Sequence, residues 1–424
     1  MIHDARRTLA VAGARIDLRL TTLSVIGVMS MHNESSAPVM AGATTPHAMV
    51  RALAARTVLA ATVVVALAAC GDSPVQPKLN SPNIPAGGAK APSAVINILP
   101  PGTTFPAKIA FATGSPVGKD AKVRVYDKNG TQLAVFYAFS GWEDFSAGVD
   151  VAVGDVTGDG WPDIVAGQGP TPKTPYPGSQ INIWDGKTGT LIKTLTPLNY
   201  VLDGWRVGTG DIDGDGKADI LGCQGPGSTT HGVAMKLDGT ALTWMSMVDI
   251  YGWKKDGCHI AGGDTNGDGK DEMVAEFDGQ IGALSVYNHA TQTRLGVINA
   301  LGNDYHGQMS IAMGDVNGDK KADIILAPLT PTSNAPVVSV FDGTKLQNST
   351  PLTKLMSFTP FSFWWKTGVH VAAHDLKGDG LVEILTKATA TPYSELGALG
   401  APTFTSWLFY LIEPGNIPSG GGIG

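Results

Sequence analysis

The sequence is poor in cysteine and carries none of the short motifs that mark common enzyme classes. Its 424 residues include only 3 cysteines, Cys70, Cys223 and Cys258, so a disulfide framework is excluded as the basis of the fold. The serine-hydrolase motif Gly-x-Ser-x-Gly, the zinc motif His-Glu-x-x-His and the phosphate-binding loop are all absent. No residue is therefore predicted to be catalytic, and a non-enzymatic role is favoured.

Basic side chains are scarce as well. The chain has 30 Lys and Arg residues against 37 Asp and Glu residues, which gives a net charge of −7. A nucleic-acid-binding protein needs a basic patch to meet the phosphates, so a nucleic-acid partner is excluded. Many of the acidic residues fall into five short loops. Bound cations would therefore neutralise much of the negative charge.

Long apolar runs are limited to one segment near the N-terminus. Residues 49–70 combine two arginines, a short apolar core and small residues before the end, which is typical of a secretory signal. The apolar core is too short for a membrane span. Residues 1–48 precede a complete signal and are interpreted as an upstream mis-start or an unstructured segment. Residues 71–92, rich in Pro, Ser and Gly, are predicted to be a tether.

The signal segment ends in Leu67-Ala-Ala-Cys70 followed by Gly71, and this ending resembles a bacterial lipobox. The resemblance implies that Cys70 is lipidated and becomes the first residue of the mature protein. The alternative is an ordinary signal peptide that contains a cysteine. We expect an exported protein, either anchored by its lipid to the cell envelope, facing the periplasm or the surface, or secreted. Its only contact with a membrane would be the lipid.

Glycine (54) and proline (27) are abundant, as expected for many short strands joined by turns. One nine-residue loop recurs five times, beginning at Asp155, Asp211, Asp264, Asp315 and Asp375. Oxygen-bearing side chains at positions one, three, five and nine suit a hard divalent cation, and glycines at positions four and six allow the tight bend. Short apolar runs flank each loop, so each is predicted to join two strands. The spacing of 51 to 60 residues indicates four-stranded propeller blades.

The loops differ in their fit to calcium. Lys320 replaces the position-six glycine in the fourth loop, so a more strained bend is predicted there. Lys377 stands at position three of the fifth loop, where its ammonium can act only as an internal cation. Four calcium sites are expected, or five if the last loop also binds. Ion-free turns and magnesium fit less well. The predicted ligands are Asp155, Thr157, Asp159, Trp161, Asp163, Asp211, Asp213, Asp215, Lys217, Asp219, Asp264, Asn266, Asp268, Lys270, Glu272, Asp315, Asn317, Asp319, Lys321, Asp323, Asp375, Asp379 and Glu383.

These loops and their flanking strands resemble the FG-GAP/VCBS repeat, the calcium-loop repeat of integrin α-subunit propellers. The resemblance implies an all-β propeller over residues 93–416, with six blades of four antiparallel strands, or seven as the alternative. The first blade lacks a loop, and a strand at 93–99 is expected to complete the ring. Residues 406–412 are predicted as the third strand of the last blade, and residues 417–424 as a disordered tail.

Cys223 and Cys258 fall in neighbouring blades, where they would form either a bridge or two small buried side chains; the second is favoured.

The face opposite the metal loops collects long, aromatic connections, which suit sugars or protein surfaces. We expect a monomeric, non-catalytic binding or adhesion module for carbohydrate or an extracellular protein. The alternative is a calcium-dependent lyase or dehydratase acting on polysaccharide. Ligand-face candidates are Trp142, Tyr176, Trp205, His231, Trp253, Tyr305, Trp364 and Tyr393.

Overall fold

The computed structural model describes most of the predicted propeller and little of the N-terminal region. The residues described are 7–11, 14–18, 104–117, 120–139, 147–170, 178–198, 202–227, 231–239, 241–249, 257–277, 283–288, 293–299, 307–330, 335–348, 352–361, 367–389, 394–401, 404, 407–413 and 423–424. The chain divides into two units, Met1–Asp72 and Ser73–Gly424. The predicted signal segment and tether lie outside the described residues.

The described residues of the first unit form an antiparallel pair of strands, β1 (Arg7–Val11) and β2 (Ala14–Leu18). Both strands fall in the stretch 1–48 that we expected to be unstructured or untranslated. Among the described residues, no helix is long and apolar enough to cross a membrane.

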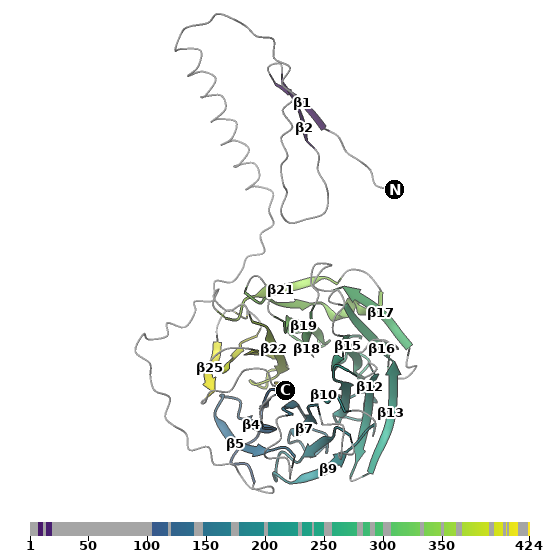
Figure 1. Ribbon diagram of the computed structural model, residues 1–424, viewed down its shortest axis with the longest axis vertical. Helices are drawn as coiled ribbons and strands as arrows, with labels where there is room; N and C mark the ends of the chain where they lie inside the picture. The colour runs from purple at the N-terminus through teal and green to yellow at the C-terminus, as the bar shows by residue number, and fades with distance from the viewer. Residues whose placement is uncertain are drawn as a thin grey trace, which may run out of the picture. The chain divides into compact units, whose positions relative to one another are not determined.

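The second unit is a six-bladed β-propeller, as predicted (Figure 1). Each blade is one antiparallel sheet whose strands follow chain order from the axis outward. The five complete blades are β6 (Val149–Gly154), β7 (Asp163–Gln168), β8 (Ile181–Trp184), β9 (Leu191–Leu195); β10 (Trp205–Gly210), β11 (Asp219–Gln224), β12 (His231–Asp238), β13 (Ala241–Asp249); β14 (Cys258–Gly263), β15 (Glu272–Phe277), β16 (Ala283–Asn288), β17 (Thr293–Asn299); β18 (Met309–Gly314), β19 (Asp323–Pro328), β20 (Val338–Phe341), β21 (Lys354–Phe358); and β22 (Val369–His374), β23 (Glu383–Ala388), β24 (Ser394–Leu399), β25 (Trp407–Glu413).

The last blade corrects one strand assignment. Its third strand is β24, and the run predicted to be third forms β25, the fourth and outermost strand. The short apolar stretch in β24 had not been recognised as a strand. All five loop-bearing blades therefore have four strands.

The first blade is closed by the far end of the chain. Its own strands are β3 (Phe111–Gly114), β4 (Lys122–Tyr126) and β5 (Gln132–Tyr137), in the second, third and fourth positions. Ile423 forms an antiparallel bridge with Thr113, and Gly424 exchanges backbone hydrogen bonds of 2.7 and 3.1 Å with Ala112. Residues 423–424 are thus paired and buried, contrary to the predicted disordered tail. The strand expected at 93–99 lies outside the described residues.

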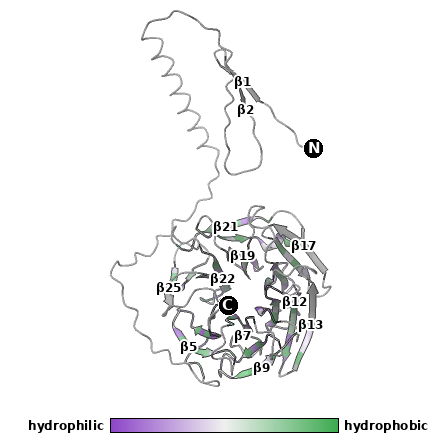
Figure 2. Cartoon of the chain, viewed as in Figure 1, coloured by the Kyte–Doolittle hydropathy of each residue, from purple (hydrophilic) through white to green (hydrophobic). Residues whose placement is uncertain are grey.

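Apolar side chains fill the spaces between blades rather than one central core. Trp205 and Val233 of the third blade pack with Ile181 of the second in one buried cluster. The ring of Phe111 in the first blade stacks on that of Phe409 in the last, with centroids 5.5 Å apart. Figure 2 shows hydrophobic residues along β5, β9 and β12. Because both faces of each blade meet a neighbour, the inner strands read as almost continuous apolar runs.

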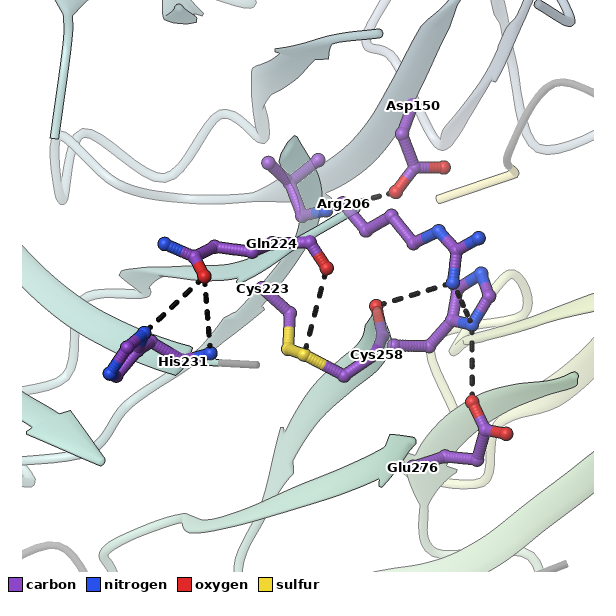
Figure 3. Close-up of a disulfide and its surroundings, with 9 residues drawn as sticks. Asp150, Arg206, Cys223, Gln224, His231, Cys258 and Glu276 are labelled. Carbon is purple, nitrogen blue, oxygen red and sulfur yellow. Dashed lines mark hydrogen bonds and ion pairs between the residues drawn. A yellow bond between two sulfur atoms is a disulfide. The ribbon is translucent and has the colours of Figure 1, made fainter. Parts of the chain in front are cut away.

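A disulfide joins the third and fourth blades. Cys223 on β11 and Cys258 on β14 are bonded, with their Cα atoms 5.6 Å apart (Figure 3). The favoured expectation of two unpaired thiols was wrong, because sequence spacing does not show that β11 and β14 face each other. Disulfides persist in oxidising compartments, so the bond indicates an extracytoplasmic location.

Removing the disulfide is expected to lower stability without changing the fold. The bond closes a loop with a sequence separation of 35, so the double variant Cys223→Ala/Cys258→Ala should lose about 2–4 kcal/mol of unfolding free energy. Urea denaturation measures this loss. The reductant TCEP should destabilise the wild type and leave the double variant unchanged. Equal responses of the two proteins to TCEP would contradict the assignment.

Candidate metal loops and an axial pocket

Each aspartate loop is the turn between the first and second strands of its blade. In the second loop, Gly214 and Gly216 have φ angles of 78° and 85°, in the left-handed region that glycine tolerates. Lys320 takes the same conformation in the fourth loop, with a φ of 64°. The strain predicted at this lysine is therefore present in the structure.

The side-chain carboxylate of the first aspartate in each loop accepts hydrogen bonds from backbone amides of the same loop. Asp211 Oδ1 accepts hydrogen bonds from Gly214 N (2.8 Å) and Asp215 N (3.0 Å), and its Oδ2 accepts one from Gly216 N (2.8 Å). The first and fifth loops repeat this pattern around Asp155 and Asp375. These contacts preform the bend and fix the orientation of the position-one carboxylate.

The carboxylate at position nine of each loop is buried. Asp219 is 1% exposed, and its Oδ2 accepts from Ile212 N at 2.9 Å. Burial raises the pKa of Asp163 to about 6 and the pKa values of Asp219 and Asp323 to about 7. A buried ionised carboxylate is costly alone, and a nearby divalent cation would offset that cost.

The second loop contains the acidic cluster that can hold a metal ion. Asp211, Asp213 and Asp215 each place one carboxylate oxygen within 4.8 Å of the others, and they form the one such cluster among the described residues. An all-oxygen set fits a hard cation such as calcium. Lys236 on β12 lies against the cluster, with its Nζ 2.5 Å from Asp213 Oδ2 and 2.6 Å from Asp215 Oδ2. The Lys236 ammonium therefore forms ion pairs with two of the three carboxylates that would bind the metal ion.

Other loops satisfy part of their charge internally. In the fifth loop, Lys377 Nζ lies 2.6 Å from Glu383 Oε1 and 2.9 Å from Ala401 O, so its ammonium serves as an internal cation. In the third and fourth loops, the position-three asparagine donates its side-chain amide to the position-nine carboxylate: Asn266 to Glu272 at 2.7 Å and Asn317 to Asp323 at 3.0 Å. The contact of Lys377 matches the internal cation expected in the fifth loop, whereas the asparagine contacts of the third and fourth loops were not predicted.

Backbone hydrogen bonds connect each loop to the next one around the ring. The position-eight amide of one loop donates to the position-one carbonyl of the preceding loop. The four bonds are Ala218 N to Asp155 O (2.9 Å), Asp271 N to Asp211 O (2.8 Å), Ala322 N to Asp264 O (2.7 Å) and Val382 N to Asp315 O (2.9 Å). The first loop has Pro162 at position eight. A proline has no amide to donate, and the first blade has no loop to accept.

A pocket lies at the propeller axis, away from the loops. This axial pocket is a cavity of about 530 Å³, and residues from all six blades line it. Its lining residues stand at the beginnings of inner strands and just beyond the ends of second strands, whereas the loops join the opposite strand ends. Six residues of strand separate the two levels by roughly 17 Å. The pocket thus opens on the face predicted to bind ligand.

A ring of polar residues surrounds the axis at this level. Each lies at the second position of an inner strand, five residues before the first aspartate of its loop. They are Asp150, Arg206, His259, Ser310 and His370. Four of the five line the axial pocket, and Ser310 instead exchanges hydrogen bonds with the backbone of Val371 in the next blade.

Specific contacts hold these side chains in place (Figure 3). Arg206 Nη1 lies 3.1 Å from His259 Nδ1 and 3.5 Å from Cys258 O. His259 Nδ1 also lies 3.3 Å from Glu276 Oε2. Asp150 Oδ2 accepts from Val207 N at 2.9 Å. Each contact crosses to the next blade or to the paired strand, so the pocket wall is built before any ligand arrives.

Burial sets the charge of the groups at the axis. It raises the pKa of Asp150 to about 6, against the lowering effects of the Val207 amide and the Arg206 guanidinium. Burial also holds the pKa of His259 well below its usual value, and the Arg206 charge acts in the same direction. His259 is therefore neutral near pH 7.

The structure describes two of the eight predicted ligand-face residues. Trp205 lines the axial pocket but is 1% exposed, and its indole Nε1 donates to Ser179 O at 3.1 Å. Its ring is packed between blades, which leaves no open face for stacking. His231 contacts Gln224 Oε1 through its backbone amide and ring (Figure 3). Outside the described residues lie Trp142, Tyr176, Trp253, Tyr305, Trp364, Tyr393 and the lipidation candidate Cys70.

Sequence reasoning missed Asp150 and Arg206. A signal for them exists, because every inner strand carries a polar residue at the same distance before its loop. Burying a polar side chain costs free energy. A polar residue repeated at the same position of successive apolar strands therefore indicates a functional role.

Comparisons with known proteins find distant structural similarity and no family. No protein-family model and no curated protein matches the chain. Among solved structures, Bacillus licheniformis rhamnogalacturonan lyase PL11 has 14% identity and a TM-score of 0.34, over 71% of this chain and 57% of that one. AofleA from Arthrobotrys oligospora has 12% identity and a TM-score of 0.41, over 76% and 89%. TolB from Acinetobacter baumannii has 14% identity and a TM-score of 0.43, over 75% and 67%. The chain therefore spans about half the length of the lyase, and its likeness to all three is distant.

The loops are expected to respond differently to loss of the same carboxylate. Asp215→Ala removes one member of the metal cluster, so the purified protein should lose about one bound calcium and part of its stabilisation by calcium. Asp379→Ala is the matched change in the loop that Lys377 neutralises, and it should leave both unchanged. Elemental analysis and melting curves measure the two effects. Equal losses of calcium and stability in both variants would contradict the assignment of the metal site to the second loop.

The calcium-free protein should become less stable as pH rises. The carboxyl groups of Asp163, Asp219 and Asp323 ordinarily have a pKa of 3.8 and are raised to about 6, 7 and 7 in the fold. Between these values the three carboxyl groups bind more protons in the folded state than in the unfolded state, so they make stability fall with rising pH. Burial lowers the pKa values of His259 and His374, which act in the opposite direction but only below about pH 6.5.

Melting temperatures from pH 5 to pH 8 in EDTA and in calcium test this dependence. The stabilisation by calcium should widen toward pH 8, because the cation compensates ionised carboxylates. A flat or rising curve in EDTA over this range would show that burial of these carboxylates is compensated without an ion.

Proposed function

We propose that the protein is an extracytoplasmic, calcium-stabilised β-propeller that acts as a non-catalytic binding or adhesion module. The observation that carries the proposal is the axial pocket, which all six blades build on the face opposite the aspartate loops. Concave sites with a few placed polar groups are the usual form of ligand sites. The ligand is a carbohydrate or an extracellular protein.

The loops are proposed to hold calcium in the manner of FG-GAP/VCBS repeats, which the sequence resembles. The oxygen cluster of Asp211, Asp213 and Asp215 supports this assignment in one loop. The other loops repeat the same backbone geometry with fewer convergent carboxylates. In this proposal the ions stabilise the ring, and the pocket on the other face binds the ligand.

Lipidation of Cys70 is proposed to anchor the propeller to the cell envelope. The lipobox-like ending Leu67-Ala-Ala-Cys70 supports it, and the disulfide between Cys223 and Cys258 agrees with export. Labelling with a fatty-acid analogue should mark the wild type and spare Cys70→Ala.

Ligand binding is tested with the exported protein on a glycan array and on immobilised extracellular matrix proteins. Saturable binding is expected in calcium, with loss in EDTA as the ring weakens. The same preparations are incubated with uronate polymers, and no new ultraviolet absorbance should develop. Formation of unsaturated products would contradict the non-catalytic proposal and show that the protein is a lyase.

A further inference from the structure

The axial pocket presents both hydrogen-bond donors and acceptors from several blades. Among its described lining residues, Asp150, Asp203 and Gln308 offer acceptor oxygens, while Arg206, His259 and Gln308 offer donor nitrogens. Small nonpolar groups, including Ala147 and Val149, line the rest. A ligand that fits must therefore combine hydroxyl-like groups, which donate and accept, with apolar surface.

Charge in the pocket does not favour an ion. Of the described lining residues, Asp150 and Asp203 carry acidic side chains and Arg206 a permanently basic one. Lys387 also acts electrostatically on Asp150, and Glu276 lies against His259. Charges of both signs therefore surround the pocket, and neither sign dominates enough to select an ionic ligand. The residues of the axis also form no cluster of convergent metal-ligating atoms, since the described part of the chain has that arrangement only in the second loop.

The polar groups are preorganised rather than flexible. Contacts with His259 and Cys258 hold the Arg206 guanidinium, and the Val207 amide holds one oxygen of Asp150. Glu276, which is fully buried, has its Oε2 3.3 Å from His259 Nδ1, the nitrogen that Arg206 Nη1 also approaches, so the tautomer of His259 decides which of the two contacts is a hydrogen bond. A carboxylate has about four lone-pair sites, so Asp150 can accept from a ligand hydroxyl in addition to Val207.

We propose that the axial pocket binds a neutral sugar residue, with Asp150 accepting from its hydroxyl groups and Arg206 donating to them. The hydroxyl groups of a sugar ring can both donate and accept hydrogen bonds, as the polar lining requires. The C–H groups on the faces of the ring can pack against the apolar part of the lining. The volume of about 530 Å³ is large enough for a short oligosaccharide end. This inference rests on the proposed binding function and narrows its ligand to one class.

The test uses matched pairs of small glycosides and the exported protein in calcium. Methyl galactoside, glucoside and mannoside are compared by ligand-observed NMR and calorimetry with the methyl glycosides of galacturonate, glucuronate and mannuronate. At least one neutral glycoside should bind, and the uronate of the same ring configuration should bind at least about tenfold more weakly. A uronate that binds as tightly as its neutral partner, or a panel with no neutral binder, overturns the proposal.

Variants then locate the site. Asp150→Asn and Arg206→Gln should each weaken neutral glycoside binding at least about tenfold, as expected for loss of a hydrogen bond to a charged group. Asp238→Asn, an exposed acidic position on the β12–β13 turn, is the control and should bind as the wild type does. Full binding by both pocket variants overturns the proposal. If a variant does not fold, as judged by melting in calcium, the neutral-against-uronate comparison on the wild type still decides.

Failure of this inference can be separated from failure of the broader function. Suppose that no neutral glycoside binds while an immobilised protein is bound and Arg206→Gln abolishes that binding. The axial pocket is then a protein-binding site, so the sugar proposal falls and the binding module remains. Absence of binding to every glycan and every matrix protein would remove both.

Discussion

The propeller depends on hydrogen bonds that pass from blade to blade at two levels. At the loops, the amides of Ala218, Asp271, Ala322 and Val382 donate to the first carbonyl of the preceding loop. At the axis, Asp150, Arg206 and Ser310 reach the backbone of the next inner strand. Apolar packing between blades is not directional, so these bonds fix how each sheet is placed against its neighbour. Calcium would act on the first level, by holding the loop that supplies the accepting carbonyl.

Much of this architecture was predictable because it repeats. Five loops at a spacing of 51 to 60 residues predicted the turns and the blade length, since each repeat tests the reading of the others. The strands before the first loop added a sixth blade, with seven as the alternative that the structure removes. The internal cation at Lys377 and the strained turn at Lys320 followed from single departures from the pattern. Local chemistry decides such features, and a sequence displays local chemistry directly.

The features that were not predicted depend on contacts between distant segments. The bond between Cys223 and Cys258 requires β11 and β14 to face each other, which spacing does not reveal. Asp150 and Arg206 each look like an isolated exception within an apolar strand. They form one site only when the blades are arranged around the axis. The repeated aspartate motif lies at the opposite end of the same strands and does not indicate this site.

The pairing of Ile423 with Thr113 bears on how the molecule reaches its final form. The first blade takes the inner partner of β3 from residues 423–424, so without this pairing the inner edge of β3 would be open. An open edge can recruit foreign strands. Pairing of residues 423–424 with β3 therefore covers an edge at which the protein could otherwise associate with other chains. Substitutions that weaken this pairing would act on aggregation more than on the axial pocket.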